Sequence, residues 1–140
     1  MATERTLILV KPDGVERNLI GEVIRRIETK GYTIVALQMR VAPEDVLAEH
    51  YAEHKEKPFY GDLVSYMGSG PVVAIVAEGD QVVAGFRSLA GATRPTEAAP
   101  GTIRGDLGRD WGTGNVENVV HGSDAPESAQ REISIWFPDL

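Results

Sequence analysis

The 140-residue sequence contains no cysteine, which excludes disulfides, thiolate metal sites and a cysteine nucleophile. It has no apolar run near the ~20 residues that a membrane-spanning helix needs. Its polar opening, from Met1 to Arg5, is unlike a secretory signal. No segment repeats along the chain, which argues against a solenoid. These absences favour a single soluble, cytoplasmic domain that spans residues 1–140 and has no membrane partner.

Basic charge is scarce as well. The formal net charge is -7, and no basic stripe is visible that could neutralise the phosphates of a nucleic acid. Nucleic acid is therefore not expected as a partner, and an anionic substrate must meet a local cluster of Lys and Arg. The sequence also lacks the G-x-x-x-x-G-K-[ST] loop and the H-R-D and D-F-G motifs of protein kinases. Any chemistry on ATP must use a phosphate site of another design.

Apolar segments with strand spacing alternate with amphipathic helices along the chain. The expected strands cover residues 6–10, 32–41, 72–77 and 116–121, and the expected helices cover 20–31, 43–54, 82–90 and 125–137. Ser123 or Asp124 could cap the last helix. Residues 91–115 show little periodicity and predict a long ordered loop, which in a compact domain is usually functional. The order β-α-β-β-α-β, with additional helices, predicts an α+β fold of the ferredoxin-like pattern.

His121 lies at the end of the last expected strand, directly before a glycine turn and a helix. On that helix Glu132 falls inside the apolar stripe formed by Ala125, Ala129, Ile133 and Trp136. A carboxylate that faces the core needs a partner, because burying an unpaired charge is costly. The nearest candidate is the imidazole of His121. A carboxylate that holds one ring nitrogen would leave the other free to attack phosphorus.

Three cations stand next to expected loops: Lys11, Arg87 and Arg104. Phosphoryl transfer depends on charge neutralisation and positioning more than on covalent help. A phosphate site for this reaction is therefore expected to contain several Lys and Arg side chains. Taken one at a time, each of the three is more simply a solvated surface charge.

Two other functions compete with phosphoryl transfer. The segment from His50 to His54 matches H-x-x-E-H, a motif of zinc peptidases, with both histidines on one face of a helix. Such an enzyme needs a further ligand and a larger body, so an exposed amphipathic turn is the simpler interpretation. A ferredoxin-like regulatory module without catalysis is the other alternative, but it would not explain Glu132 inside the apolar stripe.

Three segments resemble the signature segments of nucleoside diphosphate kinases: Lys11–Gly14, Gly101–Asp106 and Asn118–Asp124. The resemblance runs from about Arg5 to Phe137. It implies a ferredoxin-like αβ sandwich with an antiparallel four-stranded sheet. It also implies transfer of the γ-phosphoryl group from a nucleoside triphosphate to a nucleoside diphosphate, by a ping-pong route through phosphohistidine. Mg²⁺ would arrive mainly with the nucleotide phosphates, without a metal ligand from the protein, and the assembly would be a homo-oligomer, a hexamer rather than a tetramer.

The resemblance also implies roles for residues that bind the nucleotide. Lys11 and Asn118 would contact the sugar hydroxyls, with Lys11 also close to the transferred phosphoryl group. The phosphates would be held by Arg87, Thr93 and Arg104. The stretch between Arg104 and Asn118 is longer than in most family members.

The same resemblance places four residues around the nucleophile His121. Tyr51 would line the site, and Phe59 would stack on the base. Ser123 and Glu132 would position the catalytic imidazole. One geometric condition follows: in a regular strand residues 118 and 121 point to opposite faces, so a bulge or an early strand end is needed if both line one site.

Overall fold

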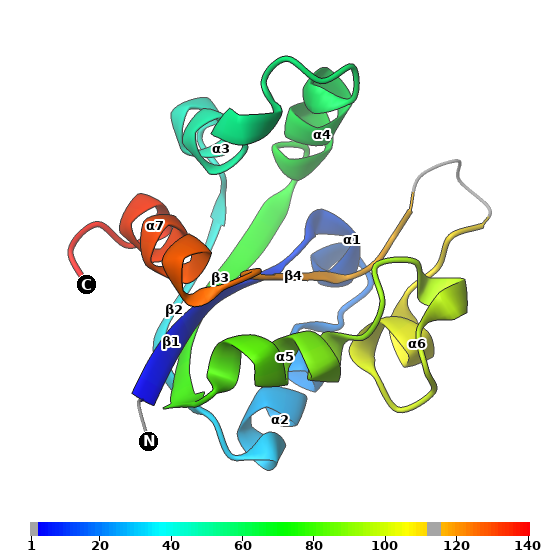
Figure 1. Ribbon diagram of the computed structural model, residues 1–140. Helices are drawn as coiled ribbons and strands as arrows, with labels where there is room; N and C mark the ends of the chain where they lie inside the picture. Colours follow the sequence, from blue (N-terminus) through cyan, green and yellow to red (C-terminus); the bar gives the residue numbers. More distant parts are fainter. Residues whose placement is uncertain (1–2, 112–115) are drawn as a thin grey trace.

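The computed structural model describes residues 3–111 and 116–140, shown in Figure 1. In chain order the elements are β1 (Thr3–Val10), α1 (Pro12–Glu16), α2 (Ile20–Lys30), β2 (Thr33–Val41), α3 (Glu44–His50), η1 (Ala52–His54), α4 (Tyr60–Met67), β3 (Pro71–Asp80), α5 (Val82–Ala90), η2 (Pro95–Glu97), α6 (Ile103–Leu107), β4 (Val120–Gly122) and α7 (Pro126–Trp136). The central part of the long stretch between Arg104 and Asn118, with Gly112 and Gly114, lies outside the described residues.

The four strands form one antiparallel sheet in the order β2-β3-β1-β4, which confirms the expected ferredoxin-like fold. β1 lies inside the sheet, and its last residues are fully buried. Successive side chains of a strand point to opposite faces. Ile8 and Val10 accordingly join the core under α2 and α5, whereas Leu7 and Leu9 join the core under α3, α4 and α7.

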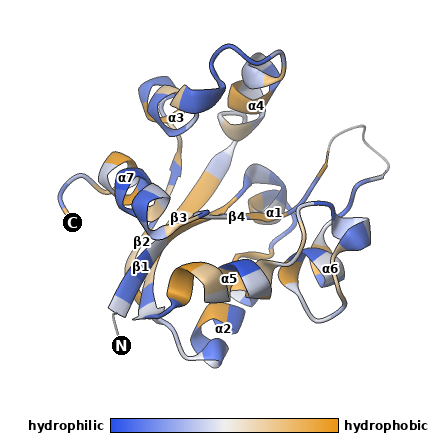
Figure 2. Cartoon of the chain, viewed as in Figure 1, coloured by the Kyte–Doolittle hydropathy of each residue, from blue (hydrophilic) through white to orange (hydrophobic). Residues whose placement is uncertain are grey.

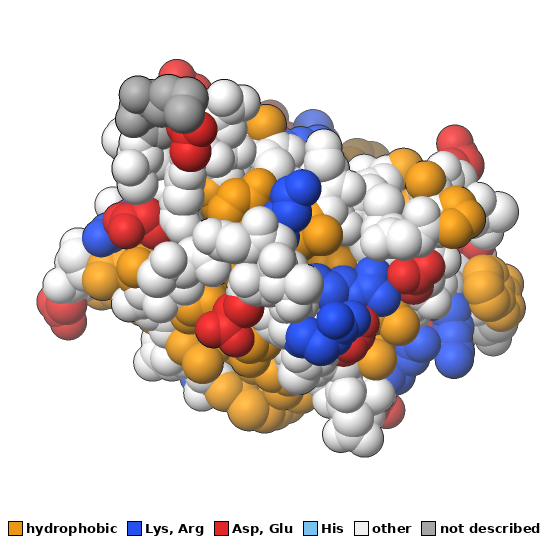
Figure 3. All heavy atoms as spheres, turned by 90° about the horizontal axis from the view of Figure 1, so that it is seen from below, with side chains coloured by type: hydrophobic (Ala, Val, Ile, Leu, Met, Phe, Trp, Pro, Cys, Tyr) orange, Lys and Arg blue, Asp and Glu red, His pale blue; other side chains and the backbone are white. Residues whose placement is uncertain are grey.

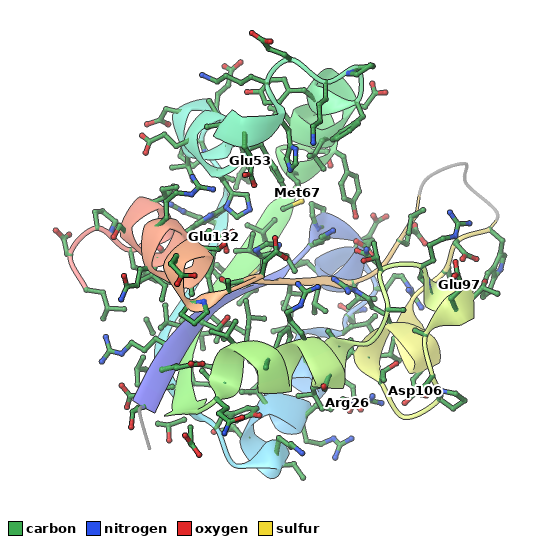
Figure 4. All side chains as sticks on the ribbon, viewed as in Figure 1. Arg26, Glu53, Met67, Glu97, Asp106 and Glu132 are labelled. Atoms are coloured by element: carbon green, nitrogen blue, oxygen red, sulfur yellow. The ribbon has the colours of Figure 1, made fainter. Side chains whose placement is uncertain are left out.

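The helices cover both faces of the sheet, as Figure 1 shows. In Figure 2 the hydrophobic residues of the helices and strands gather toward the sheet, and the hydrophilic ones lie outside. Figure 3 looks onto the side of α2 and α5, where basic and acidic side chains lie next to one another. Arg26 of α2 and Asp106 of α6 point toward each other in Figure 4, with nitrogen and oxygen 2.9 Å apart. This ion pair fastens α6 to the helical layer. No helix in the described part of the chain has the length and apolarity to cross a membrane.

Residues 91–115 are not one irregular loop, because they contain η2 and α6. The side chain of Thr102 caps α6 by accepting a hydrogen bond from the amide of Gly105 at 3.0 Å. A helix of five residues is too short to show a period of 3.6, so the expected loop was wrong for a physical reason. The helix α4 was not expected either.

The last strand is shorter than expected. β4 contains Val120 to Gly122 alone, whereas the sequence pattern predicts a strand from Val116. Val119, just before it, has a left-handed backbone with φ of 69°. The chain therefore turns between Asn118 and His121. The irregularity needed for both to line one site is neither a bulge nor an early strand end, but a late start of β4 after a left-handed turn.

The last helix is capped differently from the expectation. Its N-cap is Ala125, and neither Ser123 nor Asp124 forms a capping hydrogen bond. The hydroxyl of Ser123 donates to Glu132 instead, and the carboxylate of Asp124 accepts from Arg87. Both side chains are thus engaged with distant partners.

Candidate active site

His121, Glu132 and Ser123 form a connected group where β4 leads into α7. Nε2 of His121 lies 3.0 Å from Oε1 of Glu132, and the hydroxyl of Ser123 donates to the same oxygen at 2.7 Å. Glu132 is on the face of α7 that turns toward the sheet (Figure 4). A carboxylate oxygen accepts, so the geometry assigns the neutral imidazole its proton on Nε2. Nδ1 then carries the free lone pair.

The charge of Glu132 is maintained by its partners. Burial alone would raise the pKa of this carboxyl group. The hydrogen bond and charge of His121, together with the Ser123 hydroxyl, outweigh burial and hold the pKa below its usual range. Glu132 therefore stays ionised at neutral pH and can stabilise positive charge on the imidazole ring.

A second histidine packs against His121. The ring centroids of His50 and His121 are 4.9 Å apart in an edge-to-face arrangement, and His50 is 4% exposed. Nε1 of Trp136 donates to Nδ1 of His50 at 3.1 Å. Burial, followed by the charge of His121, lowers the pKa of His50 to about 3, so this imidazole stays neutral. The interpretation of the His50–His54 segment as an exposed turn is therefore wrong for His50.

The zinc-peptidase alternative required both histidines of H-x-x-E-H on one helical face. α3 ends at His50, and His54 lies in η1, so a single helix does not carry both residues. The donor atoms of His50, His121 and Glu132 do lie within 4.8 Å of one another. Several of these atoms already form the hydrogen bonds described above, and His54 is not in the group.

Lys11 and Asn118 are in direct contact. Nζ of Lys11 donates to Oδ1 of Asn118 at 2.8 Å, and Nδ2 of Asn118 donates to the backbone carbonyl of Thr93 at 3.2 Å. Burial, followed by the charge of Arg104 and opposed by that of Asp13, lowers the pKa of Lys11 to about 8. A buried ammonium of this kind gains from an anion brought next to it.

Arg104 braces the backbone that carries the histidine. Its guanidinium donates to three carbonyl oxygens: Gly91 at 2.9 Å, Val120 at 2.7 Å and Asn118 at 3.3 Å. Burial and then the charge of Arg87 lower its pKa.

Lys11 and Arg104 meet at Asn118, which accepts a hydrogen bond from each. The charge of Arg104 lowers the pKa of Lys11, and the charge of Arg87 lowers the pKa of Arg104. Arg87 is exposed and pairs with Asp124 at 2.7 Å. Like charges gathered in this way predict a bound anion.

The two expected aromatic residues differ in their exposure. Tyr51 is buried against His50, with ring centroids 4.6 Å apart. Burial, aided by the charge of Glu132, raises the pKa of its hydroxyl, which keeps its proton. Phe59 is 49% exposed, and Lys57 Nζ lies 5.7 Å from its ring centre. An exposed ring beside a cation is available to stack on a ligand.

Sequence reasoning missed four residues of this region. His50 was assigned to the zinc motif, and Trp136 was seen as an apolar stripe residue alone. Asp13 is in the signature segment Lys11–Gly14, but no role was derived for it. Tyr66, which contacts Asp13, carries no sequence signal.

The chain is similar to known proteins over nearly its whole length. A sequence model of the nucleoside diphosphate kinase family matches residues 4–140. The chain is 59% identical over 139 residues to the nucleoside diphosphate kinase of Corynebacterium diphtheriae, covering 99% of each chain. It is 57% identical over 138 residues to that of Mycobacterium avium, covering 98% of each. A solved structure of the Halobacterium salinarum enzyme in complex with CDP superposes with a TM-score of 0.91 at 48% identity, covering 99% of this chain and 90% of that one.

Proposed function

The chain belongs to the nucleoside diphosphate kinase family, and from this premise we propose how its residues carry out the reaction. It transfers the γ-phosphoryl group of a nucleoside triphosphate to a nucleoside diphosphate, by the ping-pong route through phosphohistidine that is general for the family. We also propose that residues 1–140 form one domain.

We assign the nucleophile to Nδ1 of His121. The observation that carries this assignment is the 3.0 Å contact of Nε2 with the ionised Glu132, which leaves the Nδ1 lone pair free. An Nδ1–P bond forms as the bond between the γ-phosphorus and its bridging oxygen breaks, and the electron pair leaves with the nucleoside diphosphate. Glu132 offsets the positive charge that develops on the ring. A terminal phosphate oxygen of the second nucleotide then attacks phosphorus and releases Nδ1.

The mutual effect of the charges of Lys11, Arg104 and Arg87 supports their role in holding the phosphates. Thr93, whose carbonyl accepts from the Asn118 side chain, would hold them as well. Phosphoryl transfer gains most from fixed positive charge around the equatorial oxygens. Arg87 would exchange its exposed partner Asp124 for a phosphate. Lys11 and Asn118, already joined at 2.8 Å, would contact the sugar hydroxyls.

Phe59 would stack on the base, and Tyr51 would close the site on the side of His50. Stacking is tolerant of sequence because every base has a π-face. A site of this kind accepts several bases. Its substrates would be nucleoside di- and triphosphates in general.

The family uses a divalent cation with its nucleotides, and we propose Mg²⁺. Mg²⁺ prefers oxygen ligands and keeps several waters. The two buried carboxylates of the region are engaged, Glu132 with His121 and Ser123, and Asp13 with Val119 and Tyr66. This arrangement suits an ion that arrives on the nucleotide phosphates and neutralises their charge, with no ligand from the protein.

We propose a homo-oligomer, a hexamer rather than a tetramer. The edge strand β2 supports self-association, because it exposes three large apolar side chains: Leu37, Met39 and Val41. Sedimentation at several protein concentrations tests the size of the assembly.

The cytoplasm is the proposed location, because it holds the nucleotide pools that such an enzyme equilibrates. We propose no nucleic-acid or membrane partner, in keeping with the net charge of -7. Cell fractionation tests the location.

The deciding experiment mixes the purified protein with γ-labelled ATP and Mg²⁺ without an acceptor. We expect one phosphoryl group per chain, lost in acid and stable in base, with release of ADP. Subsequent addition of a nucleoside diphosphate should discharge it as the triphosphate. A regulatory module or a zinc hydrolase forms no such intermediate, so its absence would reject the proposed assignment.

A further inference from the structure

Asp13 is a buried carboxylate that the roles above leave unused. It lies on α1 and is 4% exposed. Its Oδ2 accepts from the amide of Val119 at 3.1 Å, and its Oδ1 accepts from the hydroxyl of Tyr66. The amide of Asp13 donates back to the Tyr66 oxygen at 3.2 Å. Among the described residues it forms no salt bridge, so both its oxygens serve neutral donors on other elements.

Val119 needs such support. A β-branched residue with φ of 69° is a backbone outlier that persists only where its surroundings hold it. Its side chain is fully buried, and its carbonyl accepts from the amide of Lys11 at 2.8 Å. The bond from its amide to Asp13 completes the pair, so both backbone groups of Val119 are held by the segment that begins at Lys11.

The conformation of Val119 sets the relation between two residues of the site. It is the turn that lets Asn118 reach Lys11 and Thr93 while His121 reaches Glu132. If residue 119 relaxed to the extended conformation, residues 118 and 121 would point to opposite faces of the strand.

We propose that Asp13 is a positioning residue for the nucleophile. By holding the Val119 amide it maintains the left-handed turn that aims His121 and Asn118 into one site. Tyr66 lies on α4, the helix that directly follows Phe59, and its hydroxyl donates to Asp13. Asp13 therefore links the helix beside the proposed base-stacking residue Phe59 to the segment that carries His121. Burial and the bond to Asp13 raise the pKa of Tyr66, which keeps its hydroxyl protonated as a donor. The proposal rests on the proposed function of His121.

The test compares Asp13→Ala with the conservative Asp13→Asn. An asparagine can accept from the Val119 amide with its carbonyl oxygen and donate to Tyr66 with its NH₂ group, so it should restore most of what alanine loses. Single-turnover phosphorylation of His121 is followed against ATP concentration. We expect Asp13→Ala to lower the saturating rate roughly 10- to 100-fold, the scale of a nucleophile misplaced by about 1 Å, and also to weaken the apparent ATP affinity, because Asn118 depends on the same turn.

A spectroscopic readout separates positioning from general loss of structure. Long-range proton–nitrogen NMR of the His121 ring should show the Nε2–H tautomer in the parent and in Asp13→Asn, and a mixture of tautomers in Asp13→Ala. Glu16→Gln, an exposed carboxylate on the same helix, should match the parent in both measurements.

If Asp13→Ala does not fold, Tyr66→Phe serves as the test in its place. It removes the hydroxyl alone and should slow phosphorylation about 2- to 10-fold, the loss of one hydrogen bond, while Tyr60→Phe on the same helix should not. An unchanged rate in Asp13→Ala, or in Tyr66→Phe where alanine is not tolerated, would overturn the proposal. An Asp13→Asn variant as slow as Asp13→Ala would also overturn it, because charge rather than the bond to Val119 would then matter. If the parent itself gains no phosphoryl group, the proposed function fails, and this proposal with it.

Discussion

Nε2 of His121 and Oε1 of Glu132 lie 3.0 Å apart at the junction of β4 and α7. This contact leaves one ring nitrogen without a protein partner described in the structure, so removing the ring should remove the covalent route. We expect His121→Asn to fold but to show neither phosphoenzyme nor nucleotide exchange. His54→Asn should still form the phosphoenzyme. Mass spectrometry in base and a coupled exchange assay measure both; full exchange in His121→Asn would reject the mechanism.

Glu132→Gln should keep the fold but phosphorylate roughly 10- to 1000-fold more slowly, because a neutral amide neither fixes the tautomer nor offsets charge on the ring. Ser123→Ala should slow it about 2- to 10-fold, because the carboxylate of Glu132 would lose one hydrogen bond but keep its contact with His121. Rapid-quench single turnovers at saturating ATP measure the rates. Glu127→Gln, exposed on the same helix, is the matched control. A parental rate in Glu132→Gln would make Glu132 a structural charge.

The pKa of Lys11, lowered to about 8 by burial, predicts an alkaline limb in the activity. As pH rises through this value the nucleotide-free protein loses the Lys11 charge, so kcat/KM should fall by up to about tenfold per pH unit. Lys11→Arg should lack this limb, because a guanidinium stays protonated. If the alkaline fall in kcat/KM persisted in Lys11→Arg, a group other than Lys11 would be responsible for it.

The same lowered pKa of Lys11 predicts that stability rises with pH where kcat/KM falls. Between pH 8 and 10.5 the unfolded chain holds the Lys11 proton that the folded chain has lost. The free energy of unfolding should therefore gain from Lys11 as pH rises through this window.

Trp136→Phe should destabilise the fold by about 1–3 kcal/mol, because Nδ1 of the buried His50 would lose its donor. Trp111→Phe is the control, since Trp111 is 61% exposed, and its change should stay within about 0.5 kcal/mol. Urea unfolding at one fixed protein concentration measures both, because the proposed assembly would contribute to apparent stability. Equal changes in the two variants would contradict the role of the indole donor.

Much of the architecture followed from periodicity. Helices of about three turns and strands with three or more alternations were predicted from the sequence. The position of Glu132 inside an apolar stripe correctly indicated its contact with His121. α6 escaped because five residues cannot show a helical period, although Thr102 offered a capping signal. Local pattern was sufficient where one face of a long element is buried.

The remaining features depend on contacts between distant segments. His50 is buried by Trp136, 86 residues away, so its own neighbours in sequence gave no warning. Val119 is held in a left-handed turn by Asp13, 106 residues away, against the preference of a β-branched residue. In both cases tertiary contacts override the local signal, which a single sequence does not reveal.

The two edges of the sheet differ in what they offer to other chains. β4 is three residues long and is followed closely by α7, so it exposes few unpaired backbone N–H and C=O groups. β2 is nine residues long, and Leu37, Met39 and Val41 are each more than half exposed along it. A long apolar edge is a template for any unpaired strand, including one from a partly folded copy. In the proposed homo-oligomer, folded chains that have not yet assembled would be the ones at risk of aggregation, so conditions that dissociate the assembly would expose this edge.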